Sequence, residues 1–187
     1  MMNLNRRAAV AALWGAVLAA APMVIGQAQA WAVEVGEPAP EFSLPSTAGG
    51  DIALKDFRGK KWVLLEFYGA DFSPACAANL SARKADYKRF EGLGVQNLAA
   101  SANLSFSQQT FAETLGLPFP LLSDFPARNT MRSYGVLNEK LMVANRSFFL
   151  IDPQGVVRKK WMIENPVTTV VYSETVLRDI RDIVAKR

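Results

Sequence analysis

Residues 62–80 read WVLLEFYGADFSPACAANL, and this stretch passes from one type of local structure to another. Its first seven residues, 62–68, are a continuous apolar run of β-prone side chains, which predicts a central strand buried on both faces. Ser73 then suits a helix N-cap, and Pro74 suits the first helical position. Apolar side chains recur at helical spacing further on, at Cys76, Leu80, Tyr87 and Phe90. The stretch therefore predicts a buried strand followed by a helix whose first turn carries Cys76.

Cys76 is the only cysteine in the 187 residues, and the chain has no histidine. Without an imidazole, Ser-His and Cys-His catalysis, His-ligated zinc and His-ligated haem are all excluded. A single thiol cannot form an internal disulfide, a CxxC redox pair or a thiolate zinc cage. We therefore expect no metal and no cofactor, and a redox cycle at Cys76 needs a second thiol from another molecule.

The first thirty residues have the features of an export signal. Arg6 and Arg7 precede an apolar run over residues 8–25, and the segment GQAQA that follows ends in Ala28 and Ala30, which suit an A-x-A cleavage site. We predict a signal peptide over 1–30 and a periplasmic or secreted protein. The apolar run has 18 residues, the lower limit for crossing a bilayer, so an uncleaved membrane anchor is the alternative.

The remaining chain, 31–187, has the size of one domain. Removal of the two arginines lowers the formal charge from +4 to +2, and the remaining charges alternate in sign. This pattern is unlike a nucleic-acid-binding surface. We therefore predict a single domain that does not bind nucleic acid.

Strand and helix patterns alternate through this domain. The domain begins with an extended entry segment, residues 36–51. The expected strands are 52–57 (a short strand or hairpin arm), 62–68, 95–101, 119–124, 147–152 and 156–163. One expected helix begins at Ser73, two others cover 105–116 and 127–135, and the last begins at about Ser173. Such interleaving predicts an α/β fold with helices on both faces of the sheet. The turn DPQG at 152–155 predicts an antiparallel pair of last strands, and hence a mixed sheet.

The position of Cys76 in a first helical turn favours its thiolate, because a helix N-terminus carries unpaired N–H groups and a partial positive charge. The alternative is a small buried apolar residue without chemistry. Full ionisation of an ordinary thiol gains only about 30-fold in rate at pH 7. Attack on a peroxide also needs donors for the departing oxygen, for which Ser73 supplies a hydroxyl. A cation is still required.

Several segments together resemble the peroxiredoxins, the alkyl hydroperoxide reductase/thiol-specific antioxidant family. They are VGEPAPEFSLPSTAGGDIALKDFRGKKWVLLEFY, DFSPAC, LPFPLLSD, YGVLNE and NRSFFLIDPQGVVRKKW, in that order between Val35 and about Trp161. The segments PFPLLSDF, YGVLNE and ANRSFFLID are most similar to the E-type, one-cysteine alkyl hydroperoxide reductases. The resemblance implies a thioredoxin-like fold and a thiol peroxidase that reduces hydrogen peroxide or organic hydroperoxides.

The family motif P-x-x-x-T/S-x-x-C with a distant arginine implies the site residues. Cys76 matches the peroxidatic cysteine, Ser73 the Thr/Ser, and Arg146 the arginine that steadies the thiolate and the peroxide oxygens. The motif's proline is replaced by Gly69, which implies a looser and wetter pocket; the alternative is that this glycine permits a tight turn. Asn79 stands where the family usually has a glutamate. Gly69, Phe72 and Ala75 are expected to line the substrate pocket.

The resemblance also implies partners, namely a homodimeric second copy and an external reductant, either a low-molecular-weight thiol or a thioredoxin-like protein. Two other functions stay open at this point. The changes at Gly69 and Asn79 are compatible with a non-catalytic redoxin-like binding or scaffold protein. A thioredoxin-like disulfide exchanger is less consistent with the sequence, because Ser73 stands where a CxxC pair needs its first sulfur.

Overall fold

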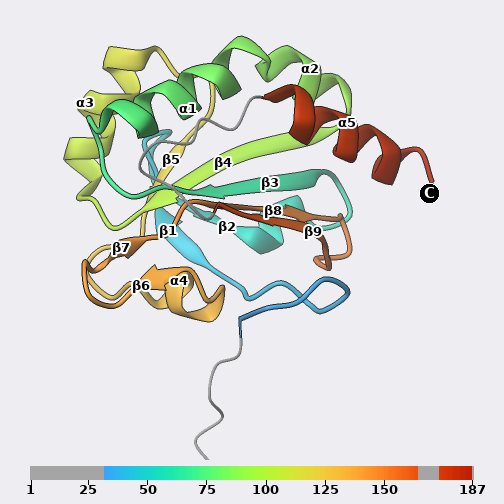
Figure 1. Cartoon of the computed structure of the whole chain (residues 1–187), viewed down its shortest axis with the longest axis horizontal. Coiled ribbons are helices and arrows are strands. Elements are labelled where there is room, and N and C mark those ends of the chain that lie inside the picture. The colour runs from blue at the N-terminus through green and yellow to red at the C-terminus, as the bar shows by residue number, and fades with distance from the viewer. Residues whose placement is uncertain (1–31, 164–172, 187) are drawn as a thin grey trace, which may run out of the picture.

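The computed structural model describes residues 32–163 and 173–186, and its centre is a five-stranded sheet in the order β5-β4-β3-β8-β9 (Figure 1). The strands are β3 (Trp62–Phe67), β4 (Val95–Ser101), β5 (Leu121–Ser123), β8 (Ser147–Ile151) and β9 (Val157–Met162). β3 pairs in parallel with β4 and antiparallel with β8, while β8 and β9 form an antiparallel pair. The predicted mixed sheet is confirmed.

The central strand β3 is buried along its whole length, as its apolar sequence predicts. Val63, Leu65 and Phe67 point to one face of the sheet and belong to the largest core cluster. Leu64 points to the other face and packs with a second cluster that includes residues of the C-terminal helix. Both faces of the sheet therefore carry a packed layer.

Helices cover both sides of the sheet, which confirms the α/β prediction (Figure 1). They are α1 (Pro74–Ala85), α2 (Tyr87–Gly92), α3 (Ser105–Leu115), α4 (Asn129–Ser133) and α5 (Ser173–Val184). In Figure 1, α1, α2 and α5 lie on one side of the sheet, and α4 lies on the other. A hairpin of β1 (Ser43–Pro45) and β2 (Asp51–Ala53) and the small pair β6 (Leu137–Asn138) and β7 (Val143–Ala144) complete the fold.

Two local predictions need correction. The segment 52–57 is a strand only up to Ala53, and Leu54–Phe57 is a 3₁₀ helix that Asp56 helps to begin by accepting the Ala53 amide at 2.9 Å. The helical spacing that runs on from Cys76 to Phe90 belongs to two helices, because Asp86 leaves the helical conformation between them. The strands β1, β6 and β7 were not predicted, because their two or three residues are too few to show alternation.

The predicted signal peptide or anchor at 1–30 lies outside the described residues. Within 32–163 and 173–186, none of the helices has both the length and the apolar character needed to cross a membrane. The predicted C-terminal helix is present as α5, and its apolar face covers the sheet through Val176, Leu177 and Ile180.

Candidate active site

The site forms where β3 ends and α1 begins. Pro74 opens the helix, so Cys76 lies in its first turn, as predicted. Its side chain is 4% exposed and packs against a cluster that includes Tyr68 and Leu80. The sulfur also borders a pocket on its other side. The thiol is therefore sheltered by the core but accessible to a small molecule.

Arg146 places a cation beside the sulfur, as the family resemblance implied. Its Nη2 donates a hydrogen bond to the sulfur of Cys76 at 3.2 Å, and its side chain is 2% exposed. Arg146 directly precedes β8, the neighbour of β3 in the sheet, so two residues 70 positions apart meet at one strand edge. The guanidinium therefore places a positive charge and an N–H donor directly against the sulfur.

The pocket beside the sulfur has a volume of about 380 Å³. It is lined by Gly69, Ala70, Ser73, Cys76, Asn138, Leu141, Val143, Ala144, Asn145 and Arg146. Four of the lining residues, Gly69, Ser73, Cys76 and Arg146, were expected from the sequence. The wall contributed by the β6–β7 segment was not, because nothing local to residues 138–144 connects them with a thiol 60 positions earlier.

Phe72 and Ala75 are not among the residues that line this pocket. Phe72 is 54% exposed, has a left-handed backbone with φ 59°, and places its ring 4.9 Å from the ring of Phe111. The carbonyl oxygen of Ala75 accepts a hydrogen bond from the side chain of Asn79 at 2.7 Å. Asn79 is fully buried and thus contacts the first turn of α1 from within the core.

Ser73 occupies the N-cap position with an extended backbone, φ −64° and ψ 130°, as predicted. Its hydroxyl makes no capping hydrogen bond to the first turn of α1. The side chain borders the pocket beside Cys76 instead. Ser73 therefore lines the space that a substrate would enter.

Gly69 does not have the backbone conformation that would require a glycine. Its φ lies outside the left-handed region, and a β-carbon at this position would meet the Ala144 carbonyl oxygen at 3.6 Å, an ordinary contact distance. The structure therefore shows no conformational need for glycine at this position. The position lines the pocket and could accept a larger residue.

The loop that carries Ser73 is tied to α3 by the carboxylate of Asp71. Tyr68 donates its hydroxyl to one oxygen of Asp71 at 2.8 Å, and Ser107 donates to the other at 2.6 Å. Burial raises the pKa of Asp71, and these two hydrogen bonds oppose the rise. The start of α1 is thus held by side chains as well as by its own backbone.

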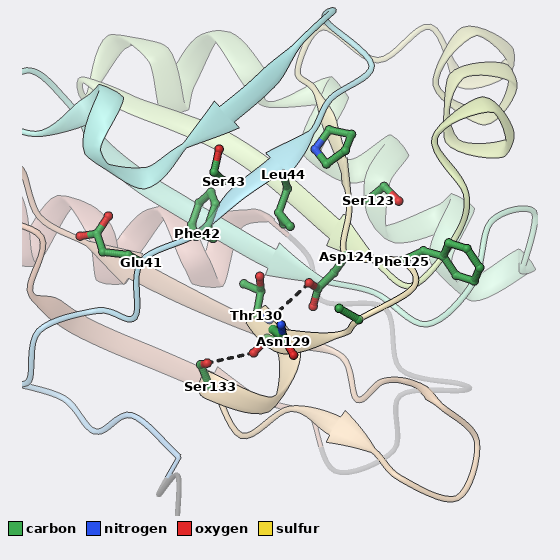
Figure 2. A pocket seen from close by; sticks show the side chains of 12 residues that line it. Glu41, Phe42, Ser43, Leu44, Ser123, Asp124, Phe125, Asn129, Thr130 and Ser133 are labelled. Carbon is green, nitrogen blue, oxygen red and sulfur yellow. Dashed lines mark hydrogen bonds between the residues drawn. The ribbon is translucent and has the colours of Figure 1, made fainter.

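A second pocket, of about 360 Å³, lies between β1, the end of β5 and α4 (Figure 2). Its most buried charged group is Asp124, which accepts backbone N–H groups of Thr130 at 3.3 Å and Met131 at 2.8 Å. That carboxylate is used to cap α4. The pocket contains neither a thiol nor an arginine, so the chemistry of the described residues is concentrated at Cys76.

Comparisons with known proteins show the family to which the chain belongs. The family model described as "AhpC/TSA family" matches residues 35–160. A peroxiredoxin of Thermoplasma volcanium is 35% identical over 155 residues, covering 80% of this chain and 74% of the relative. Alkyl hydroperoxide reductase E of Mycobacterium tuberculosis is 35% identical over 127 residues, covering 67% of this chain and 83% of the relative.

Solved structures show the same fold. A reduced 2-Cys peroxiredoxin of Plasmodium vivax superimposes with a TM-score of 0.74 at 28% identity, covering 81% of this chain and 82% of that one. Peroxidoxin BcpB of Mycobacterium tuberculosis gives 0.71 at 26% identity, covering 81% and 98%. The thioredoxin-like fold expected from the sequence is confirmed. The chain belongs to the AhpC/TSA family, the peroxiredoxins.

Proposed function

We propose that this protein is a thiol-dependent peroxidase, a one-cysteine peroxiredoxin in which Cys76 is the peroxidatic residue. The observation that carries the proposal is the 3.2 Å hydrogen bond from Arg146 to the Cys76 sulfur at the edge of an accessible pocket. A buried structural thiol has no need of a buried guanidinium, because moving that charge out of water is costly. An ionised sulfur offsets the cost.

In the first half-reaction the Cys76 thiolate attacks one oxygen of a hydroperoxide. A sulfur–oxygen bond forms, the oxygen–oxygen bond breaks, and the second oxygen leaves as water or an alcohol after it gains a proton. Negative charge develops on that leaving oxygen, and Arg146 and Ser73, which line the pocket, are the donors that we expect to stabilise it. Sulfur is oxidised to sulfenic acid and the peroxide is reduced.

The second half-reaction needs thiols from outside the chain, because Cys76 is the only cysteine. One external thiol condenses with the sulfenic acid, forms a mixed disulfide and releases water. A second thiol attacks that disulfide, which frees Cys76 and leaves the two external sulfurs bonded to each other. Cys76 lines this pocket, so we expect the reductant to approach there.

Neither alternative function is favoured. A scaffold that had lost its chemistry would not require Arg146 to stay buried against the sulfur, yet it does. A disulfide exchanger would need a second sulfur near Cys76, and Ser73 occupies that position.

The test is the second-order rate with hydrogen peroxide and with a bulkier organic hydroperoxide, followed by Trp fluorescence on reduced protein. Arg146→Ala should lower the rate by about 10²-fold or more, since one donor to a developing oxyanion is worth that much. Arg58→Ala, at an exposed pair with Glu41, is the matched control and should not change it. A wild-type rate no faster than free cysteine would refute the proposal.

Two further properties are proposed on the sequence and the family. Export to the periplasm or beyond is supported by the A-x-A site ending at Ala30, and the mature protein should begin at Trp31 when the full chain is expressed in a bacterium. N-terminal sequencing of the exported protein checks the site, and a membrane-bound full-length chain would indicate the anchor instead.

A homodimer is supported by family resemblance, and light scattering measures the molar mass that tests it.

A further inference from the structure

A second set of buried charges lies behind Arg146. Glu66 in β3 is 2% exposed and Arg83 in α1 is 1% exposed, with Arg83 Nε 3.5 Å from Glu66 Oε2. The Arg83 guanidinium also lies 5.1 Å from the centre of the Phe148 ring. Burying such ions costs several kcal/mol each unless they compensate one another. A pair this deep in the core calls for a reason beyond stability.

The backbone places this pair in the same layer as the reactive sulfur. Glu66 is opposite Phe148 in the β3–β8 register, and Arg146 precedes Phe148 by two residues, so the side chains of Glu66 and Arg146 share one face of the sheet. On α1, Arg83 follows Cys76 by seven residues and belongs to the same buried face. Four ionisable groups therefore meet between α1 and the sheet.

The charges of these groups are coupled. Burial raises the pKa of Glu66, and the guanidinium charges of Arg83 and Arg146 oppose that rise. Burial lowers the pKa of Arg83, and Glu66, together with Asp86 at the end of α1, opposes that fall. Asp86 is itself held in a more exposed pair with Arg89. Glu66 thus interacts with both arginines, and its carboxylate can compete with the sulfur for Arg146.

Arg83 lies against Glu66, while Arg146 lies against the sulfur. Removing the charge of Arg83 leaves the carboxylate of Glu66 to attract Arg146, and removing the carboxylate of Glu66 ends that competition.

We propose that Arg83 is a positioning residue for the peroxidase: it neutralises Glu66, so that the charge of Arg146 stays with the sulfur of Cys76. Arg83 does not touch the pocket and acts through Glu66. Of the measurements that test this inference, only the peroxide rate rests on the proposed function.

The test measures the midpoint pH of Cys76 alkylation by iodoacetamide, followed by mass spectrometry, in four proteins. Arg83→Met removes the cation that neutralises Glu66, and the midpoint should rise by about one pH unit. Glu66→Gln removes the competing carboxylate and should lower it. In the double variant the net charge of the layer returns to the wild-type value, so the midpoint should return as well. The peroxide rate at pH 7 should fall up to about tenfold in Arg83→Met and recover in the double variant.

A merely structural role for the pair predicts no such recovery, because the double variant would lose both side chains. Arg83→Lys keeps the charge and should stay near the wild-type midpoint, and Arg89→Met, at a more exposed ion pair, should leave it unchanged. An unchanged midpoint in Arg83→Met, or a double variant as shifted as Arg83→Met, would overturn the proposal. If Arg83→Met does not fold, Glu66→Gln decides, and an unchanged or raised midpoint overturns it.

Alkylation needs no peroxide, so the two proposals fail separately. Wild-type protein that shows these midpoint shifts but no peroxidase activity would refute the function and leave the charge coupling standing. Wild-type peroxidase activity without these midpoint shifts would leave the function standing and refute the charge coupling.

Discussion

At the scale of single residues, the proposed reactivity of Cys76 depends on the helix start around it and on a guanidinium from a distant part of the chain. The helix start around it follows from the adjacent residues Ser73 and Pro74. The guanidinium of Arg146 comes from a strand on the other side of β3. Each contribution favours the thiolate, and only their combination also provides a donor for the leaving oxygen.

Gly69 offers a test of how the pocket is sealed. A β-carbon fits at this position, and Gly69→Pro is expected to restore the wall that the family motif has at this point. We expect a modest gain in the peroxide rate or no change, since the ring would exclude some water from the sulfur. Stopped-flow rates with hydrogen peroxide measure the effect, with Gly92→Ala on α2, where a β-carbon meets nothing, as the control. A large loss of rate in a folded Gly69→Pro would show that the open wall is needed.

At the scale of elements, the β8–β9 hairpin orients the strand end from which Arg146 projects. The turn between these strands is closed by the carboxylate of Asp152, which accepts the amides of Gln154 at 2.8 Å and Val156 at 3.0 Å. Arg158 donates to its second oxygen at 2.6 Å. Burial by itself raises the pKa of Asp152, but these hydrogen bonds outweigh it and hold the pKa below its usual value.

The lowered pKa of Asp152 gives a pH-dependent prediction. A carboxyl group whose pKa is lower in the folded protein stabilises it above the unfolded pKa, and this stabilisation is lost as the pH falls through the folded value. Asp152→Asn should therefore lower the free energy of unfolding by about 1–3 kcal/mol at pH 7, with the difference shrinking in acid. Urea denaturation at several pH values measures this. Asp51→Asn at an exposed position should change little, and a penalty that does not depend on pH would contradict the assignment.

The C-terminal helix α5 is held by its apolar face. Leu177 and Ile180 are fully buried against the sheet, whereas the Arg178 side chain is 69% exposed. Leu177→Ala should cost about 2–5 kcal/mol of unfolding free energy, because it leaves a cavity in a packed layer. Arg178→Ala should stay within about 0.5 kcal/mol. Equal effects of the two substitutions in thermal or urea denaturation would mean that α5 is not packed in this way in solution.

At the scale of the whole molecule, one thiol per chain fixes the stoichiometry of the reaction. Without an external thiol, each chain should consume one peroxide and gain one oxygen atom, because the chain has no second cysteine to resolve the sulfenic acid. Peroxide titration with intact-mass measurement and sulfenic-acid trapping checks this, with Cys76→Ser as the unreactive control. Added thiol should restore turnover. Repeated turnover in the absence of thiol would contradict the proposed cycle.

The sequence by itself determined the local elements and their class. Residues 62–80 specify the strand, the helix start and the placement of the thiol, because apolar periodicity and capping residues act over a few neighbouring positions. The DPQG turn likewise specified the antiparallel β8–β9 pair. Glu66 lies inside the same run, WVLLEFY, and only the packing of α1 on the sheet places Arg83 beside it.

The tertiary structure decided everything that depends on strand order and register. The sequence indicated Arg146 only through family resemblance, and the physical reason for its role appears when β8 pairs with β3 and brings it 3.2 Å from the Cys76 sulfur. The β6–β7 wall of the pocket, the exposure of Phe72 and the burial of Arg83 against Glu66 were also decided there. Periodicity in a sequence records which face of an element is apolar, whereas contacts between distant residues depend on how those faces are packed together.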